Sequence, residues 1–115
     1  MTHFFTPEEA NKKLSQVKPL VTRIVQLKKE IDSSGAGKQK NELMDELGMT
    51  LSRIEELGIE VKDMDMGLID FPAMRYNEPV YLCWKLGERE VLYWHGMIEG
   101  FKGRKLLRPE LAQIR

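Results

Sequence analysis

The first half of the chain begins with the hydrophobic spacing of a long helix. Apolar residues recur at steps of three and four, which places them on one face of a helix from about Pro7 to Asp32. Thr6 and Glu9 form a start signal around Pro7, because the Thr6 hydroxyl can accept from an amide of the first turn and Glu9 can accept from the Thr6 amide. The predicted apolar face contains Ala10, Leu14, Val17, Val21, Ile24, Leu27 and Ile31.

A second helical pattern follows a short polar break. Residues 33–37 contain two glycines and have no periodicity, so the first helix should end there. Pro19 lies within the first pattern and lacks an amide hydrogen for the Ser15 carbonyl, so we expect a kink there. Gly58 stands where a residue that ends the second helix would lie. These features predict an antiparallel helical hairpin over residues 7–58. Its second apolar face contains Leu43, Leu47, Leu51, Ile54 and Leu57.

The second half of the chain, residues 59–115, is typical of antiparallel strands followed by a basic tail. Aromatic and branched residues gather in residues 79–86 and 91–95, and shorter runs cover 59–63 and 67–72. The two longer runs should form a hairpin. If Leu86 faces Val91, its register pairs Trp84 with Tyr93 and Leu82 with His95 on one face, and Cys83 with Trp94 on the other; a different loop would change these pairs. The predicted class is α+β, with three or four antiparallel strands.

The hairpin presents more apolar surface than its two helices can bury against each other. Apolar residues that widen the surface beyond the seam between the two helices are Val17, Leu20, Val25, Met44 and Met49. The sheet, a second copy of the chain, or both must cover this surplus. Both faces of the strand hairpin also carry apolar groups, so one should pack on the helices and the other should be covered by a loop or a partner. We therefore expect a homodimer.

Composition and charge limit the classes of protein to which the chain could belong. The 115 residues are 42% hydrophobic and 31% charged, which suits one globular domain spanning residues 1–115. Acidic and basic residues both number 18, so the chain as a whole has no basic footprint for nucleic acid, and none is expected as a partner. The single cysteine, Cys83, suits a reducing compartment. The sequence starts without the pattern of a signal peptide and has no apolar run that could span a membrane, so a cytoplasmic protein is expected.

Three acidic residues lie close together before the longer strands. Asp63, Asp65 and Asp70 could supply oxygen ligands for a hard cation, but the remaining positions of a calcium-binding loop are absent. Solvated turn acids are the simpler interpretation. Asp70 differs from the other two, because it lies between Ile69 and Phe71 and should be paired with a cation or a hydroxyl.

His95 is the internal residue best suited to acid–base or metal chemistry. Its imidazole can act as a ligand or a general base, and Glu88 is an acid nearby in the sequence. A hydrogen-bonded structural histidine is the alternative. Cys83 is interpreted as a small buried apolar residue, and Trp84 and Trp94 as core residues. No recognised spacing of zinc ligands is present.

The segment from Gly100 to Arg115 is locally basic. Lys102 and Arg104 could bind a phosphate or carboxylate beside the glycines around them, although this is no Walker loop. The alternative is that the basic residues of this tail pair with the acidic stretch before it. The other cations of the tail are Lys105, Arg108 and Arg115.

Five blocks of sequence resemble an uncharacterised prokaryotic family, domain of unknown function 2203. The resemblance covers nearly the whole chain and is most specific in Gly67–Pro72 and in the Leu-Cys-Trp-Lys-Leu-Gly-Glu block that ends at Glu88. The resemblance implies that the chain has related proteins in this family, but it does not imply any particular enzymatic reaction. The other blocks are residues 5–14, 57–63 and 93–104. The polar and aromatic residues within the shared blocks are Asp70, Trp84, Glu88, His95 and Arg104.

Two functions follow from these patterns. The first is a self-associating structural or interaction protein, supported by the surplus apolar surface of the helices. The alternative is a small enzyme or metal-binding protein in which Asp70, Glu88 and His95 converge as catalytic groups or as ligands of a divalent metal, with Arg104 and Lys102 holding an anion. Convergence of the three side chains is the step that a structure can examine.

Overall fold

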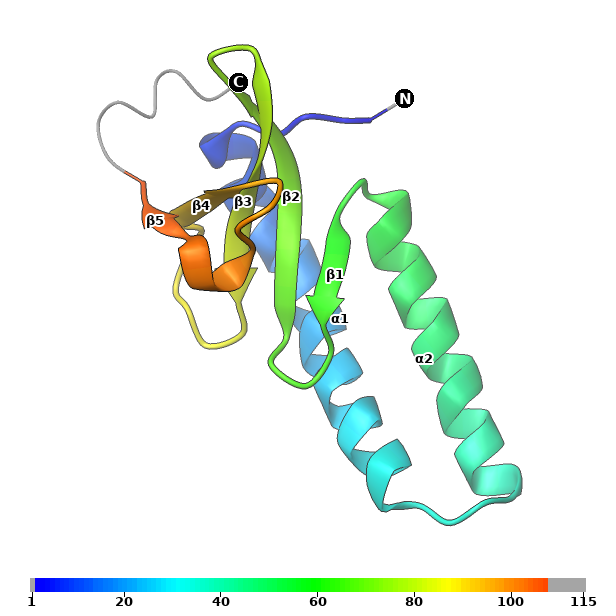
Figure 1. The fold of residues 1–115 in the computed structure, drawn as a ribbon. Coiled ribbons are helices and arrows are strands. Elements are labelled where there is room, and N and C mark those ends of the chain that lie inside the picture. Colours follow the sequence, from blue (N-terminus) through cyan, green and yellow to red (C-terminus); the bar gives the residue numbers. More distant parts are fainter. Residues whose placement is uncertain (1, 108–115) are drawn as a thin grey trace.

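The computed structural model describes residues 2–107. It confirms the predicted α+β class, with a helical hairpin followed by an antiparallel sheet (Figure 1). The elements are α1 (Pro7–Ser33), α2 (Lys38–Glu56), β1 (Glu60–Asp63), β2 (Leu68–Arg75), β3 (Glu78–Lys85), β4 (Tyr93–Gly96), the 3₁₀ turn η1 (Phe101–Gly103) and β5 (Lys105–Leu106).

Both predicted helix-end signals are present. Glu9 N donates to Thr6 Oγ1 at 3.1 Å and Thr6 N donates to Glu9 Oε1 at 2.9 Å, so the capping box is complete. Helix α1 continues through Pro19 to its end. Gly58, two residues beyond α2, has a φ of 84°, the left-handed conformation that favours glycine after a helix.

The sheet has five strands, in the order β1-β2-β3-β4-β5, rather than the three or four predicted. Strand β5 accounts for the difference, since its two residues lie in the segment interpreted as a basic tail. Tyr93 pairs with Leu106 and Trp94 with Lys105. A two-residue strand has no alternating pattern to reveal it, because it exists only through its pairing with β4.

The predicted register of the β3–β4 hairpin was wrong by one residue. Tyr81 pairs with His95 and Cys83 with Tyr93, instead of Leu82 with His95 and Trp84 with Tyr93. The loop is longer than expected because Val91 does not pair with β3. Its amide instead donates to the side chain of Asn11 on α1, at 2.7 Å. The correction moves His95 and Cys83 to the same face of the sheet.

The inner face of the sheet packs on α1 and contains the core. Residues that pair directly across strands share a face, and Figure 1 shows α1 behind β2 and β3. The sheet residues of this core are Ile69, Phe71, Ala73, Val80, Leu82 and Trp84, and those of α1 include Ala10, Leu14, Val17, Val21 and Ile24. The sheet therefore covers the apolar face of α1. It is one of the two covers predicted for the helices, the other being a second copy of the chain.

Helix α2 is covered less completely than α1. It packs on α1 and on β1, beside the sheet (Figure 1). Ile54 is fully buried, whereas Met44 and Met49 are 52% and 70% exposed. No helix within residues 2–107 has an apolar stretch long enough to cross a membrane.

Candidate functional site

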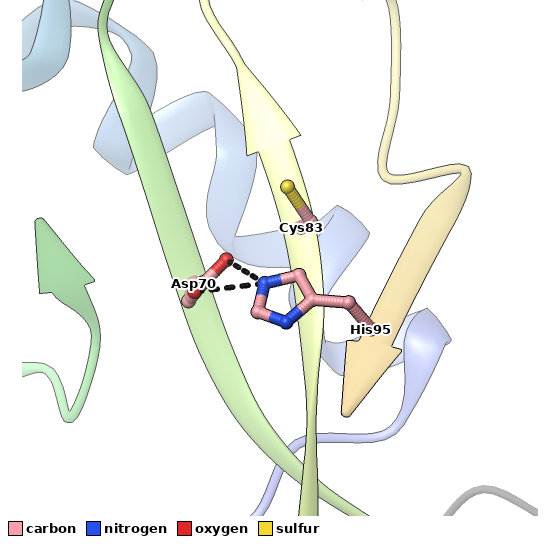
Figure 2. Close-up of side chains that lie close together, drawn as sticks. All are labelled: Asp70, Cys83 and His95. Carbon is pink, nitrogen blue, oxygen red and sulfur yellow. Dashed lines mark hydrogen bonds and ion pairs between the residues drawn. The ribbon is translucent and has the colours of Figure 1, made fainter. Parts of the chain in front are cut away.

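Three polar side chains meet on the outer face of the sheet, the face opposite α1. Asp70 comes from β2, Cys83 from β3 and His95 from β4 (Figure 2). Asp70 and Cys83 are direct cross-strand partners, and His95 reaches Asp70 over the intervening strand β3. Their exposed fractions are 2%, 0% and 3%. Burial of this kind requires that each polar group has a partner.

Both ring nitrogens of His95 are engaged. Nδ1 lies 2.7 Å from the carbonyl oxygen of Gly96, and because a carbonyl only accepts, Nδ1 carries the hydrogen. Nε2 lies 3.0 Å and 3.1 Å from the two carboxylate oxygens of Asp70. Asp70 and His95 therefore share one proton, and the pair is neutral overall. With neither nitrogen free, His95 is poorly placed to act as a general base on an outside substrate.

Burial shifts the acidity of both other members of the cluster. Burial raises the pKa of Asp70, and the neighbouring His95 opposes that rise. Burial and, to a smaller extent, the charge of Asp70 raise the pKa of Cys83 to about 12, and the neighbouring Arg104 opposes that rise. Cys83 is therefore a thiol near neutral pH, not a reactive thiolate.

An ion pair borders the cluster. Both terminal nitrogens of Arg104 donate to the carboxylate of Glu88, with Nη1 3.2 Å from Oε1. The same Nη1 lies 3.8 Å from Cys83 Sγ. Glu88 Oε1 also accepts from the Lys85 amide at 2.8 Å, which holds the carboxylate at the end of β3. The pair is half-buried, and bidentate pairing fixes the orientation of the guanidinium.

The structure brings together part of the predicted site and rearranges the rest. Asp70 and His95 are in direct contact, as the alternative hypothesis required. Glu88 instead forms an ion pair with Arg104. For Arg104, the structure therefore agrees with the second of the two predicted uses of the basic tail, which was pairing with the acidic stretch before it. Lys102 is exposed on η1, and Arg108 and Arg115 lie outside the described residues.

Cys83 is the member of the cluster that sequence reasoning missed. One ligand atom each from Asp70, Cys83 and His95 lies within 4.8 Å of the others, so the three form a potential metal-ligand set. The interpretation of Cys83 as a buried small residue is correct, but the wrong strand register placed it opposite Trp94 and away from His95. The correct pairing of β3 with β4 would have placed Cys83 on the same face as His95.

The acidic turn before β2 is separate from this cluster. Asp63 Oδ1 accepts from the amides of Asp65 and Met66, each at 2.9 Å, so it caps the turn. Asp65 is exposed and lies 3.3 Å from Lys28. This geometry agrees with the interpretation of Asp63 and Asp65 as turn acids.

The arrangement of the cluster is suited to binding a metal ion. Imidazole, thiolate and carboxylate are the three ligand types that zinc takes in proteins. The bond from His95 Nδ1 to a backbone carbonyl is the outer contact typical of a metal-bound histidine, because it leaves Nε2 for the ion. Nε2 is the nitrogen that faces Asp70.

Comparison with known proteins identifies a family. A search of curated proteins and a search of solved structures found no match. A family model described as an uncharacterized conserved protein, DUF2203, matches residues 3–107. That range includes the whole hairpin, the five strands and every residue of the cluster. The chain therefore belongs to the DUF2203 family of uncharacterised conserved proteins.

Proposed function

We propose that this protein binds a divalent transition-metal ion, zinc in the first instance, through Asp70, Cys83 and His95. The observation that carries the proposal is the convergence of three different ligand types, from three strands, within 4.8 Å in a fully buried position. A core that needed only packing would place apolar side chains there, since burying polar groups is costly.

The charge of the cluster suits a dication. The geometry gives one proton to the Asp70–His95 pair, and Cys83 carries its thiol proton. A divalent ion that displaces these two protons leaves the total charge of the buried cluster unchanged. A neutral cluster avoids the large cost of an uncompensated buried charge.

The ligand types favour zinc over magnesium or calcium. Both of these hard cations prefer an all-oxygen shell, whereas zinc accepts nitrogen and sulfur. Three protein ligands also leave one position of a tetrahedral site for water or another small ligand. This proposal replaces Glu88, one of the three predicted ligands, with Cys83.

Metal analysis of untagged protein tests the proposal. We expect about one zinc ion per chain, and after exchange with cobalt an absorption band from the cobalt–thiolate bond. Cys83→Ser should abolish that band, and His95→Ala should lower the metal content. Asp65→Asn, which changes an exposed acid outside the cluster, is the matched control. Metal at trace levels together with no cobalt–thiolate band would contradict the proposal.

Self-association through α2 is the second candidate function. Met44 and Met49 are exposed on α2 and line a shallow surface groove with Asp45 and Arg53. Neither Asp45 nor Arg53 forms an ion pair among the described residues. In an antiparallel contact of two copies centred on Met49, each Asp45 lies at the level of the partner copy's Arg53, four residues to either side. A second copy of the chain therefore has a complementary charge pattern for this groove.

The mass in solution tests self-association. A dimer is expected at micromolar concentration, and Asp45→Arg alone should convert it to a monomer. Adding Arg53→Asp to that variant should restore the dimer, because both charges are then exchanged. A strictly monomeric native protein would exclude this function.

A further inference from the structure

The Arg104 side chain has more contacts than one ion pair needs. Besides its bonds to Glu88 and Cys83, its guanidinium lies 3.8 Å from the ring centre of Tyr93 and 4.4 Å from that of Phe101. A cation over an aromatic face gains electrostatic attraction as well as contact. Arg104 thus connects β3, β4 and η1 at one point beside Cys83.

Apart from Arg104, the segment of residues 97–107 is anchored mainly at its end, where Leu107 packs against the core and Lys105 lies over the Trp94 ring. Residues 97–107 contain η1 and β5; Figure 1 shows η1 on the side of the sheet opposite α1 and β5 at the edge of the sheet beside β4. Only two residues of β5 pair with β4, and Leu107 N donates to Leu92 O at 2.6 Å. The remaining ion pair, Lys105 with Glu99, is exposed and 3.9 Å long. Exposed pairs of this kind contribute little to stability.

We propose that Arg104 is the positioning residue of the metal site: held by Glu88, it keeps the 97–107 segment closed over the cluster and directs an N–H group at the Cys83 sulfur. The metal that this closure would retain is the one in the proposed function. Closure itself is a property of the protein with or without metal, so the two proposals can fail independently.

The planar shape of the arginine side chain is what this role requires. Two parallel N–H groups meet the Glu88 carboxylate, while one of the same nitrogens reaches Cys83. A lysine at this position keeps the positive charge but cannot form the paired bonds or stack between two rings in the same way. Arg104→Lys should therefore open the segment locally and leave the rest of the fold in place.

Thiol labelling measures this opening directly, because Cys83 is the only cysteine of the chain. In native protein freed of metal, the reaction of Cys83 with N-ethylmaleimide should be slow. Loss of one charged, paired hydrogen bond should speed labelling roughly 10-fold or more in Arg104→Lys and in Glu88→Gln. Lys102→Gln changes an exposed cation of the same segment and is the matched control, expected to label at the native rate.

Two further measurements separate local opening from loss of stability. If the segment opens locally, the labelling rate at low urea hardly changes with urea concentration, whereas labelling through global unfolding rises steeply with it. Zinc transfer from loaded protein to a chelator should also be faster in Arg104→Lys than in Lys102→Gln. Equal labelling rates in all four proteins, or faster labelling that follows global unfolding, would overturn the proposal. Faster local labelling in a protein that binds no zinc would support closure and reject only the metal function.

Discussion

Cys83 lies directly opposite Asp70 in the antiparallel pairing of β2 and β3. That pairing sets thiol and carboxylate side by side on the outer face, and the β3–β4 register then brings His95 to the same face. A slip of one residue in β4 would move His95 to the inner face, among the core residues, because side chains alternate along a strand. The cluster is therefore a product of strand register in three neighbouring strands.

The pairing of Asp70 with His95 predicts strong coupling between their substitutions. Asp70→Ala leaves a buried imidazole without its partner, and His95→Ala leaves a buried carboxyl group, so each should lower the free energy of unfolding by about 3–5 kcal/mol. The double variant should lose less than the sum of the two, with a coupling energy of at least about 1 kcal/mol. Urea unfolding in the presence of a chelator measures this. Asp65→Ala is the exposed control, and strictly additive losses would contradict the pairing.

Ile54 should be the most sensitive apolar position of α2. It is fully buried in the core that α1 and the sheet share, so Ile54→Ala leaves a cavity and should cost about 2–5 kcal/mol of unfolding free energy. In the single chain Met49 is exposed, so Met49→Ala on the same helix should alter the stability of the monomer by no more than about 0.5 kcal/mol. Thermal or urea unfolding of the two variants compares them. Similar losses at both positions would mean that Met49 is covered in solution, as self-association through α2 requires.

The parts of the fold that depend on local sequence were predictable. Thr6 and Glu9 cap α1 as their spacing indicates, and Gly58 takes the left-handed conformation expected after α2. Such signals act over one or two helical turns, so the residues involved are neighbours in the sequence. The alternative hypothesis predicted, from residue type, that Asp70, Glu88 and His95 converge; Asp70 and His95 do so, whereas Glu88 pairs with Arg104.

The predictions that were wrong concern features that depend on contacts between residues distant in the sequence. The bond from Val91 to Asn11 links positions 80 residues apart, and it lengthens the loop before β4. Nothing near Val91 in the sequence indicates that its amide is taken by a helix. The one-residue error in register that followed placed Cys83 and His95 on opposite faces of the sheet. Strand β5 was missed for the same reason, since it is defined by its partner strand alone.

Asn11 should therefore matter for the β4 register as well as for stability. Its side chain accepts from Val91 N at 2.7 Å and donates to Pro7 O at 3.0 Å. Asn11→Ala leaves the amide of a buried residue without a partner and should lower the free energy of unfolding by about 1–3 kcal/mol. Hydrogen exchange of the Val91 amide should become faster in this variant. Asn41→Ala, at an exposed asparagine of α2, is the control; unchanged exchange at Val91 would show that another group holds that loop.

Pro19 predicts a substitution that stabilises the protein. It lies exposed inside α1 and has no amide hydrogen for the Ser15 carbonyl, and an internal proline costs a helix about 3 kcal/mol. Pro19→Ala restores the donor, but it also frees the unfolded chain, which offsets up to about 1 kcal/mol of that gain. The net rise in the free energy of unfolding should be about 2 kcal/mol, measured by urea unfolding. Pro7→Ala, at the first helical position where no bond is missing, should give no such rise. If Pro19→Ala is no more stable than the native protein, the kink that the sequence predicts at Pro19 contributes to packing of α1 on the sheet, and straightening the helix then costs as much packing as the restored hydrogen bond contributes.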